Sequence, residues 1–472
     1  RKKNSLMLKT SRGNLRLQCC GKNILRATYT LRENFLEKDS LMVVSPIAGE
    51  AEWRLLEKSD ELIMVLDGID VAINKKTSDL SYYDKNGKLI AKEAGRSLKP
   101  VNVIKTVFKE DAQIQTEQSV DGVRVRAAGA TEIIDRKAYE TRLHFSFEEG
   151  EALYGLGSYE EGIMNLRGRH QYLYQQNLKA LMPLLVSTNG YGILTDSYSN
   201  MTFRDDMYGS YIWTEVSDEM DYYFIYGPRL DDVIKGYREL TGKVPMLPRW
   251  AFGYIQSKER YKTRQELIDV VREYRNRKIP LDCIVLDWQS WTGNLWGQKS
   301  FDPERFPDPK GMMEEIHRLN AKLMVSVWPV MNNDGPNQLE MKEKGFLLGN
   351  QATYDAFNPD ARQLYWKQAN EGIFSNGTDA WWCDCTEPFE ADWFGEIKPE
   401  PEERIRLNTG EAKKYLDPGY INAFSLLHSK GIYEGQRKTT GNKRVVNLTR
   451  SSYAGQQRYS TITWSGDISA SW

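Results

Sequence analysis

The sequence predicts an α/β protein in which an N-terminal β-sandwich domain precedes a (β/α)8 TIM barrel, with the C-terminal part of the barrel missing from this chain. Three observations predict this fold. Residues 1–228 consist of short runs with alternating apolar and polar residues, punctuated by Gly, Asn and Asp, as in half-buried strands. From residue 250 onward the pattern becomes strand, loop and helix, repeated. Polar residues end these later strands, which favours a barrel over a doubly wound sheet, because barrel active sites are built at the carboxyl ends of strands.

A helical linker is predicted between the two domains, over residues 229–249. Its apolar residues fall on one helical face, namely Leu230, Val233, Ile234, Tyr237 and Leu240. Gly242 then acts as a stop signal, and Pro245 and Pro248 mark an extended connection.

The barrel region, residues 250–472, contains six strand candidates: AFGYIQ, LDCIVLDW, KLMVSVWP, AWWCDC, RVVNLTR and TITWSGD. Helix starts separate them, at a Thr263-x-x-Glu266 capping box, Asp308-Pro309, Asn358-Pro359 and Asp417-Pro418. A closed barrel needs eight strands. We therefore expect the complete protein to supply two more after Trp472, together with further β structure.

Composition excludes several function classes. Lys and Arg total 64 against 65 Asp and Glu, and no block of like charge dominates either half, which argues against a nucleic-acid binder with its basic face. No run approaches the roughly 20 apolar residues of a membrane span. Four scattered histidines, and five cysteines without a CxxC pair, predict that the chain has no metal site. The few cysteines also indicate a reducing, cytoplasmic compartment, and secretion stays open if a signal was removed. GLGSYEEG, residues 155–162, has its third glycine misplaced for a dinucleotide fingerprint, and we interpret it as a tight loop.

Two carboxylates carry the functional prediction. Asp384 interrupts WWCDCTEP, where a charge among tryptophans and cysteines is costly unless it is paired or used. Asp467 follows Trp464 and Gly466 in the last predicted strand, and Gly466 permits close backbone approach. Two carboxylates on one barrel rim, with aromatic walls and few histidines, are typical of a glycosidase: one acid protonates the leaving oxygen and one carboxylate attacks the anomeric carbon.

Other residues at the ends of these strands have possible structural roles as well as functional ones. Asp287 is equally a helix cap or turn residue, Arg450 equally an ion-pair partner, and Trp328 equally a core residue. Glu387 is expected to hold the neighbours of Asp384 by hydrogen bonds. Cys383 and Cys385 flank Asp384 on a strand, so we expect both thiols to pack on the face opposite its carboxylate.

These motifs resemble glycoside hydrolase family 31, which includes α-glucosidases and α-xylosidases. The resemblance covers nearly the whole chain and is most specific in LTRSSYAGQQRYSTITWSGD. It implies that Asp384 is the nucleophile and Asp467 the general acid/base. The non-reducing-end sugar would be held by Asp287, Trp328, Arg450 and Trp464, with Phe252 on the first strand where many members have Trp. The chain departs from the D-M-N-E sequence that many α-glucosidases carry around the nucleophile.

We therefore expect a retaining, exo-acting α-glycoside hydrolase for small α-glycosides or oligosaccharides, of α-xylosidase or α-glucosidase type. It would need no metal or organic cofactor and no nucleic-acid or membrane partner. The composition and motifs leave open whether the protein forms a homo-oligomer. The alternatives are an α-galactosidase of the same family or a non-catalytic carbohydrate-binding protein on this fold. A dehydrogenase is disfavoured because the dinucleotide fingerprint is absent.

Overall fold

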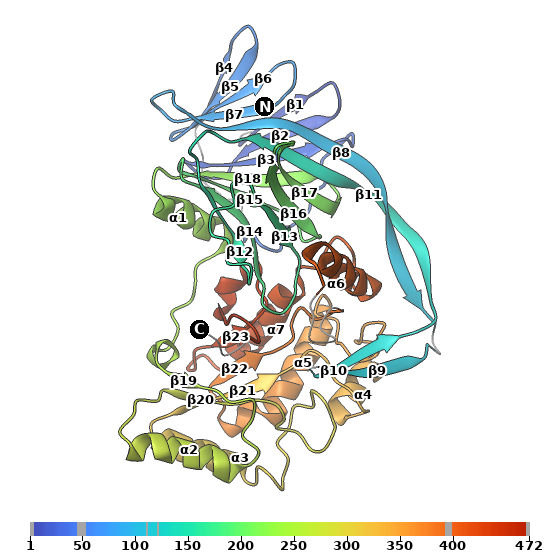
Figure 1. Ribbon diagram of the computed structural model, residues 1–472, viewed down its shortest axis with the longest axis vertical. Coiled ribbons are helices and arrows are strands. Elements are labelled where there is room, and N and C mark those ends of the chain that lie inside the picture. The colour runs from blue at the N-terminus through green and yellow to red at the C-terminus, as the bar shows by residue number, and fades with distance from the viewer. Residues whose placement is uncertain (1–3, 45–52, 110–111, 120–121, 392–398, 469–472) are drawn as a thin grey trace.

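The computed structural model describes residues 4–44, 53–109, 112–119, 122–391 and 399–468. The β-rich N-terminal half and the α/β C-terminal half follow one another along the long axis of the molecule (Figure 1). This arrangement confirms the predicted fold class, a sandwich followed by part of a barrel.

Two antiparallel sheets form the sandwich. The first has the order β1-β2-β3-β18-β15-β14-β12, with strands Ser5–Lys9 (β1), Asn14–Cys19 (β2), Ile24–Thr30 (β3), Leu153–Ser158 (β12), Ala180–Ser187 (β14), Tyr191–Thr195 (β15) and Met220–Tyr226 (β18). The second has the order β13-β16-β17-β11-β8-β7-β6-β5-β4, with strands Arg54–Glu57 (β4), Glu61–Val65 (β5), Asp70–Asn74 (β6), Leu80–Tyr83 (β7), Leu89–Phe108 (β8), Ala130–Ser146 (β11), His170–Leu173 (β13), Met201–Asp206 (β16) and Gly209–Ser217 (β17).

The sandwich core lies between the inward faces of the two sheets. Tyr82 of β7 stacks on Phe224 of β18, with ring centroids 3.7 Å apart, and its hydroxyl lies 2.7 Å from that of Tyr222. Buried aromatic pairs of this kind add about 0.5–1.5 kcal/mol beyond the area they bury.

The tight loop predicted over residues 155–162 is confirmed only for residues 159–162, which contain a turn, whereas Gly155 and Gly157 lie in a strand. Gly155 and Gly157 belong to β12, where the pairing with β14 shifts register between them. A Cβ on Gly155 would meet the Leu184 carbonyl oxygen at 2.2 Å. The glycines are therefore explained by a bulge that brings two backbones into close approach.

A long two-stranded arm leaves the sandwich and reaches the barrel (Figure 1). Strands β8 and β11 pair from Lys92–Ser146 to Phe108–Ala130, and the hairpin β9 (Ile114–Ser119) and β10 (Gly122–Ala127) stands at the tip. The hairpin docks on the barrel, because the Val125 carbonyl oxygen accepts a hydrogen bond from Asn350 at 3.1 Å. Next to it, Phe108 at the end of β8 stacks on Tyr415 of α6. The sequence pattern alone did not predict this contact.

The connection between the halves contains α1 (Leu230–Thr241), followed by the short 3-10 helix η1 (Arg249–Phe252). The α1 residues buried against the sandwich include Val233, Tyr237 and Leu240, which are among those that the helical pattern singled out.

The C-terminal half contains a six-stranded parallel sheet in the order β19-β20-β21-β22-β23-β24. Its strands are Ile255–Gln256 (β19), Cys283–Leu286 (β20), Lys322–Val327 (β21), Ala380–Cys383 (β22), Asn447–Thr449 (β23) and Thr461–Thr463 (β24). Sequential neighbours all pair, as in a barrel, whereas a doubly wound sheet reverses its strand order at a switch point. The sheet thus distinguishes between the two folds that alternating strands and helices allow.

Helices cover the outer face of this sheet. They are α2 (Arg264–Asn276), α3 (Pro309–Arg318), α4 (Pro336–Glu343), α5 (Pro359–Gly372) and α7 (Phe424–Thr439), with short 3-10 helices η2 (Phe374–Asn376) and η3 (Gln456–Tyr459). Helix α6 (Pro401–Tyr415) lies between the two halves instead, where it contacts β8 and its Lys413 pairs with Glu215 of β17 (Figure 1). The start signals at Thr263, Asp308 and Asn358 are confirmed, because each side chain accepts a backbone N–H of the first helical turn.

Two element predictions are wrong. AFGYIQ is mostly η1 and loop, with a strand only at Ile255–Gln256. The helix predicted from Asp417-Pro418 begins at Phe424, because the Asp417 carboxylate accepts the Gly419 N–H and closes a local turn. Helices α4 and α6 were not predicted.

Candidate active site

The side chains of the candidate site continue the inward-facing alternation of their strands. Cys283, Val285, Met324, Ala380 and Leu448 pack together inside the barrel, while the alternate residues pack toward the helices. Because alternation has a period of two, the first residue after each strand also points inward. Those residues are Asp287 after β20, Trp328 after β21, Asp384 after β22, Arg450 after β23 and Trp464 after β24.

Arg450 links the acidic residues of the site. Its Nη1 donates to Asp467 Oδ2 at 2.6 Å, and its Nε lies 3.6 Å from Asp384 Oδ1. The Arg450 side chain is 2% exposed. The two carboxylates singled out by the sequence therefore meet around one buried cation.

Glu387 holds that cation in place. Its Oε1 accepts from Arg450 Nε at 2.9 Å and from Ser451 Oγ at 2.6 Å. Charge-assisted hydrogen bonds of this kind are the strong ones, and they fix the plane of the guanidinium. The predicted supporting role of Glu387 through its neighbours is consistent with this geometry.

The Asp384 carboxyl group has a strongly perturbed environment. Burial raises its pKa to about 7, against the opposing charge of Arg450 and together with the like charges of Asp287, Asp467 and Glu387. The side chain keeps 18% exposure, so its carboxylate remains open to the barrel mouth. A largely buried carboxyl group with several charged neighbours in one cleft is typical of a functional site.

Asp287 is held by two hydrogen bonds at the end of the neighbouring strand. Its Oδ1 accepts from Ser326 Oγ and from the Trp288 backbone N–H, each at 2.7 Å. Burial raises its pKa to about 6, although these two bonds lower it. Asp287 is thus oriented rather than free to rotate.

Tryptophan side chains line the mouth on two sides. Trp328 is buried and packs edge-on against Trp291 and Trp296, with ring centroids 5.3 and 5.7 Å away. On the other side, Trp464 packs against Trp382 of β22 at 4.3 Å. Flat apolar walls next to hydrogen-bonding groups suit a sugar ring, which has both apolar faces and hydroxyl edges.

A cavity of about 600 Å³, counted to its open mouth, borders this cluster. Trp328, Glu387 and Arg450 line one side of it, and residues 123–126 of the β9–β10 hairpin line another. The sandwich domain therefore contributes a wall to the site, which no motif in residues 1–228 indicated.

Two sequence predictions need correction. Cys385 does not pack beside Cys383, because β22 ends at Cys383 and Cys385 adopts a left-handed φ of 51°. Its Sγ lies 3.2 Å from Arg450 Nη2, inside the site. Phe252 lies in η1, three residues before the amino end of β19, and is 71% exposed. The structure thus places it at the opposite end of the sheet from Asp384.

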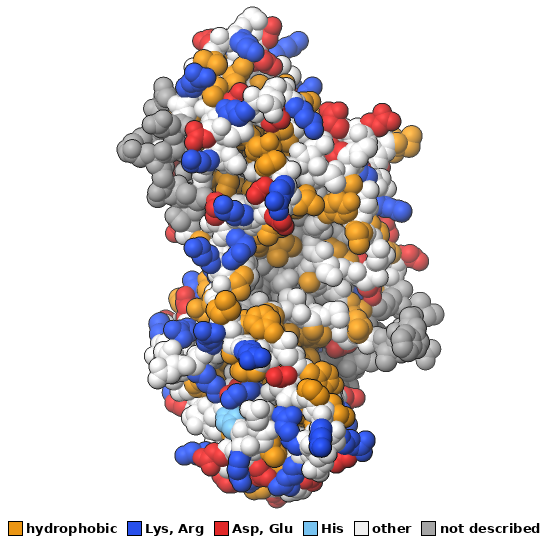
Figure 2. All heavy atoms as spheres, turned by 90° about the vertical axis from the view of Figure 1, so that its left-hand side faces the viewer, with side chains coloured by type: hydrophobic (Ala, Val, Ile, Leu, Met, Phe, Trp, Pro, Cys, Tyr) orange, Lys and Arg blue, Asp and Glu red, His pale blue; other side chains and the backbone are white. Residues whose placement is uncertain are grey.

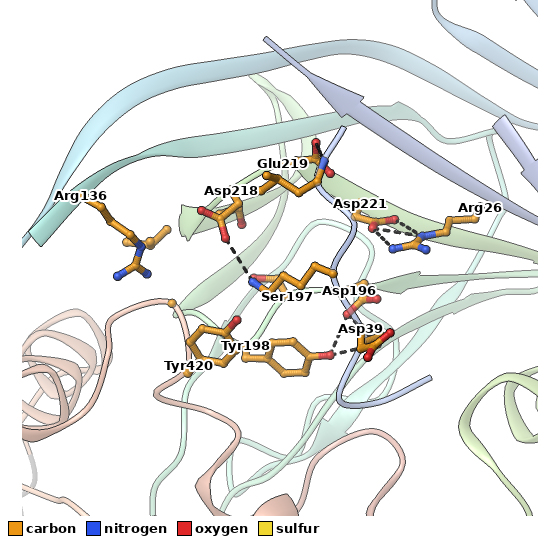
Figure 3. Close-up of a pocket in the computed structure, with 16 residues that line it drawn as sticks. Arg26, Asp39, Arg136, Asp196, Ser197, Tyr198, Asp218, Glu219, Asp221 and Tyr420 are labelled. Atoms are coloured by element: carbon orange, nitrogen blue, oxygen red, sulfur yellow. Dashed lines mark hydrogen bonds and ion pairs between the residues drawn. The ribbon is translucent and has the colours of Figure 1, made fainter. Parts of the chain in front are cut away.

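A second hollow, of about 660 Å³, lies where the sandwich meets the barrel segment around Tyr420 (Figure 3). Four of its charged groups form two ion pairs: Arg26 with Asp221 at 2.5 Å and Lys38 with Asp218 at 3.1 Å. It also lies away from the carboxyl ends of the parallel strands. We therefore assign it to the packing of the two domains rather than to the reaction.

The exposed surface has mixed charge. On the face shown in Figure 2, Lys and Arg side chains are interspersed with Asp and Glu, and no field of one sign covers it. Within the described residues, no helix combines the length and apolar character that a bilayer crossing requires.

Comparison with known proteins bears directly on this arrangement. Residues 244–472 match the Glycosyl hydrolases family 31 TIM-barrel domain, and residues 14–203 match the Glycosyl hydrolase 31 N-terminal galactose mutarotase-like domain. The Uncharacterized family 31 glucosidase ORF2 of Pseudescherichia vulneris is 31% identical over 484 residues, which cover 99% of this chain and 86% of that protein. The chain belongs to glycoside hydrolase family 31.

Two further relatives are α-xylosidases by name. One from Saccharolobus solfataricus is 36% identical over 97% of this chain, and the chain spans 58% of its length. The crystal structure of a GH31 α-xylosidase from a soil metagenome, complexed with xylose, has a TM-score of 0.79 and 27% identity, covering 100% of this chain and 68% of that one. The family resemblance inferred from the sequence motifs is confirmed.

Proposed function

We propose that this protein is a retaining, exo-acting α-glycoside hydrolase in which Asp384 is the nucleophile and Asp467 is the general acid/base. The observation that carries the proposal is the pair of carboxylates on one barrel rim, both in contact with the buried Arg450. Family membership supports the reaction class.

In the first step, the Asp384 carboxylate attacks the anomeric carbon and the bond from that carbon to the glycosidic oxygen breaks. Asp467 gives its proton to the departing oxygen, so that an alcohol leaves rather than an alkoxide. Asp287 and Arg450 hold sugar hydroxyls, while Trp328 and Trp464 exclude water around the ring. The product of this step is a covalent glycosyl–Asp384 ester.

In the second step, the ionised Asp467 takes a proton from water, and the resulting hydroxide attacks the anomeric carbon from the face that the leaving group vacated. The ester bond to Asp384 breaks, and the sugar departs with its original anomeric configuration. The ion pair between Arg450 and Asp467 corresponds to the ionised form that this step needs.

We propose α-xylosides as preferred substrates, ahead of α-glucosides, with α-galactosides behind both. Two α-xylosidases among the relatives support this order, as does the departure from D-M-N-E around Asp384. Glucose differs from xylose by one CH2OH group, a steric difference worth about 1–3 kcal/mol, or roughly 10- to 200-fold.

The test is hydrolysis of nitrophenyl α-xyloside, α-glucoside and α-galactoside, with the first-formed anomer followed by NMR. We expect α-xylose as the first product and loss of activity in Asp384→Asn. Asp355→Asn serves as a matched control, because Asp355 is a partly buried carboxylate outside the site. A β-anomer as first product would refute the retaining mechanism, and a galactoside preference above tenfold would refute the proposed substrate order.

A further inference from the structure

The sandwich domain also reaches the general acid/base candidate directly, through Asn177. This residue lies in the loop between β13 and β14 and is fully buried. Its Nδ2 donates to Asp467 Oδ2 at 2.8 Å, and its Oδ1 accepts the Asp467 backbone N–H at 3.1 Å. One side-chain amide thus hydrogen-bonds both the main chain and the carboxylate of Asp467.

The loop that carries Asn177 is itself anchored to the barrel half. The neighbouring Gln175 donates through Nε2 to the carbonyl oxygens of Asn422 and Ser452, at 3.1 and 2.9 Å. The Asn177 backbone N–H donates to the Glu390 carboxylate. The end of the sandwich that bears β13 and β14 faces the barrel, so this short loop spans the domain boundary (Figure 1).

Gly466 makes the contact possible. It adopts a φ of 85°, and a Cβ at this position would meet Asn177 Oδ1 at 2.5 Å and the Leu178 backbone nitrogen at 2.7 Å. The close approach that the sequence suggested for Gly466 is therefore an approach to the sandwich loop.

The position of the Asp467 side chain depends on contacts outside the parallel sheet. Strand β24 ends at Thr463, four residues earlier, and the Asp467 side chain is 52% exposed. The sheet ladder therefore does not fix its position as it fixes Asp384, which directly follows β22. A misplacement of about 1 Å can reduce catalysis by roughly a hundredfold.

We infer that Asn177 is a positioning residue that holds Asp467 in line with the glycosidic oxygen, so that the sandwich domain controls proton transfer in the barrel. The inference rests on the proposed function of Asp467. Asn177 acts through Asp467, and it should matter in proportion to how much the leaving group needs a proton.

The experiment compares phenyl and 2,4-dinitrophenyl α-glycosides of the sugar that the wild-type protein hydrolyses best. For Asn177→Ala we expect kcat/KM to fall about 10- to 100-fold with the phenyl leaving group, which needs the proton, and less than about threefold with dinitrophenyl, which does not. The ratio of the two values is independent of how much of the preparation is correctly folded.

Asn422→Ala is the matched control. Asn422 is an equally buried asparagine at the same boundary, and its Oδ1 accepts the Gln175 N–H at 3.1 Å. Its side-chain hydrogen bonds go to backbone groups of Gln175, Leu173 and Ser199. Asn422→Ala therefore removes an anchor of the loop while it keeps both hydrogen bonds from Asn177 to Asp467, so any loss should be similar for both leaving groups. In an Asp467→Ala background, Asn177→Ala should change the ratio less than about twofold, because the two residues act as one unit.

The outcomes separate the two ideas. A wild-type protein without glycosidase activity would refute the proposed function. An active wild type in which Asn177→Ala lowers both rates equally, or in which its effect on the ratio persists without Asp467, would overturn the positioning role alone.

Discussion

The acidic limb of the pH profile tests the environment of Asp384 quantitatively. The nucleophile must be ionised to attack, and burial raises the pKa of Asp384 to about 7, with Arg450 opposing and Asp287 adding to the rise. Its ionised fraction is lost as the pH falls through 7, reaching roughly one tenth at pH 6 and roughly one hundredth at pH 5. An aspartate at its ordinary value of 3.8 would stay ionised over this range.

We expect kcat/KM for a nitrophenyl α-glycoside to fall about tenfold per pH unit below pH 7. Asp287→Asn removes one of the like charges, so its limb should move to lower pH even though its maximum rate also falls. Because these carboxyl groups interact, the limb reports an apparent value for the group of acids.

Steady-state kinetics from pH 4.5 to 9, with substrate well below KM, gives both the height and the midpoint of the profile. Asp355→Asn should leave the midpoint unchanged, since Asp355 lies outside the site. A wild-type midpoint below pH 5, or a midpoint that Asp287→Asn does not move, would refute the electrostatic reasoning.

Three further predictions concern individual side chains. Asp467→Ala should lose turnover of substrates with poor leaving groups, keep glycosyl–enzyme formation from substrates with good leaving groups, and recover turnover when azide is added. Asp384→Ala should lose activity toward both types of substrate. If burst and steady-state assays gave identical responses for the two variants, the assigned roles would be ruled out. Burial lowers the pKa of Lys299 from 10.5 to about 7, so between pH 7 and pH 10.5 the unfolded chain binds more protons than the native protein, and the free energy of unfolding should rise with pH by up to about 1.4 kcal/mol per pH unit. Urea unfolding at about pH 7 and about pH 9 should show this rise in the wild type and not in Lys299→Met. A rise that persists in Lys299→Met would come from other groups. Phe252→Ala should change kcat/KM less than about threefold, since Phe252 lies at the amino end of the sheet; a tenfold rise in KM would place it in the site after all.

Much of the site could be predicted from the sequence because its signals are local. A strand alternates with a period of two, and parallel strands meet at one edge of their sheet. A polar residue that directly follows an apolar run is therefore directed to that edge, and Asp287, Asp384 and Arg450 were predicted in this way. The same reasoning failed at Cys385, because the strand has ended there and the backbone adopts a left-handed conformation. The alternation of the preceding strand does not predict that change.

Only the tertiary structure decided which distant segments meet at that edge. Asn177 lies 290 positions from Asp467, and the β9–β10 hairpin reaches the cavity at the tip of an arm built from β8 and β11. Neither contact has a periodic pattern, since each depends on where the domains dock and not on the neighbouring residues. The sequence by itself determined which side chains each barrel strand presents, because alternation is a property of the local backbone. The packing of the sandwich on the barrel decided what holds them, because a contact between domains exists only once both have folded.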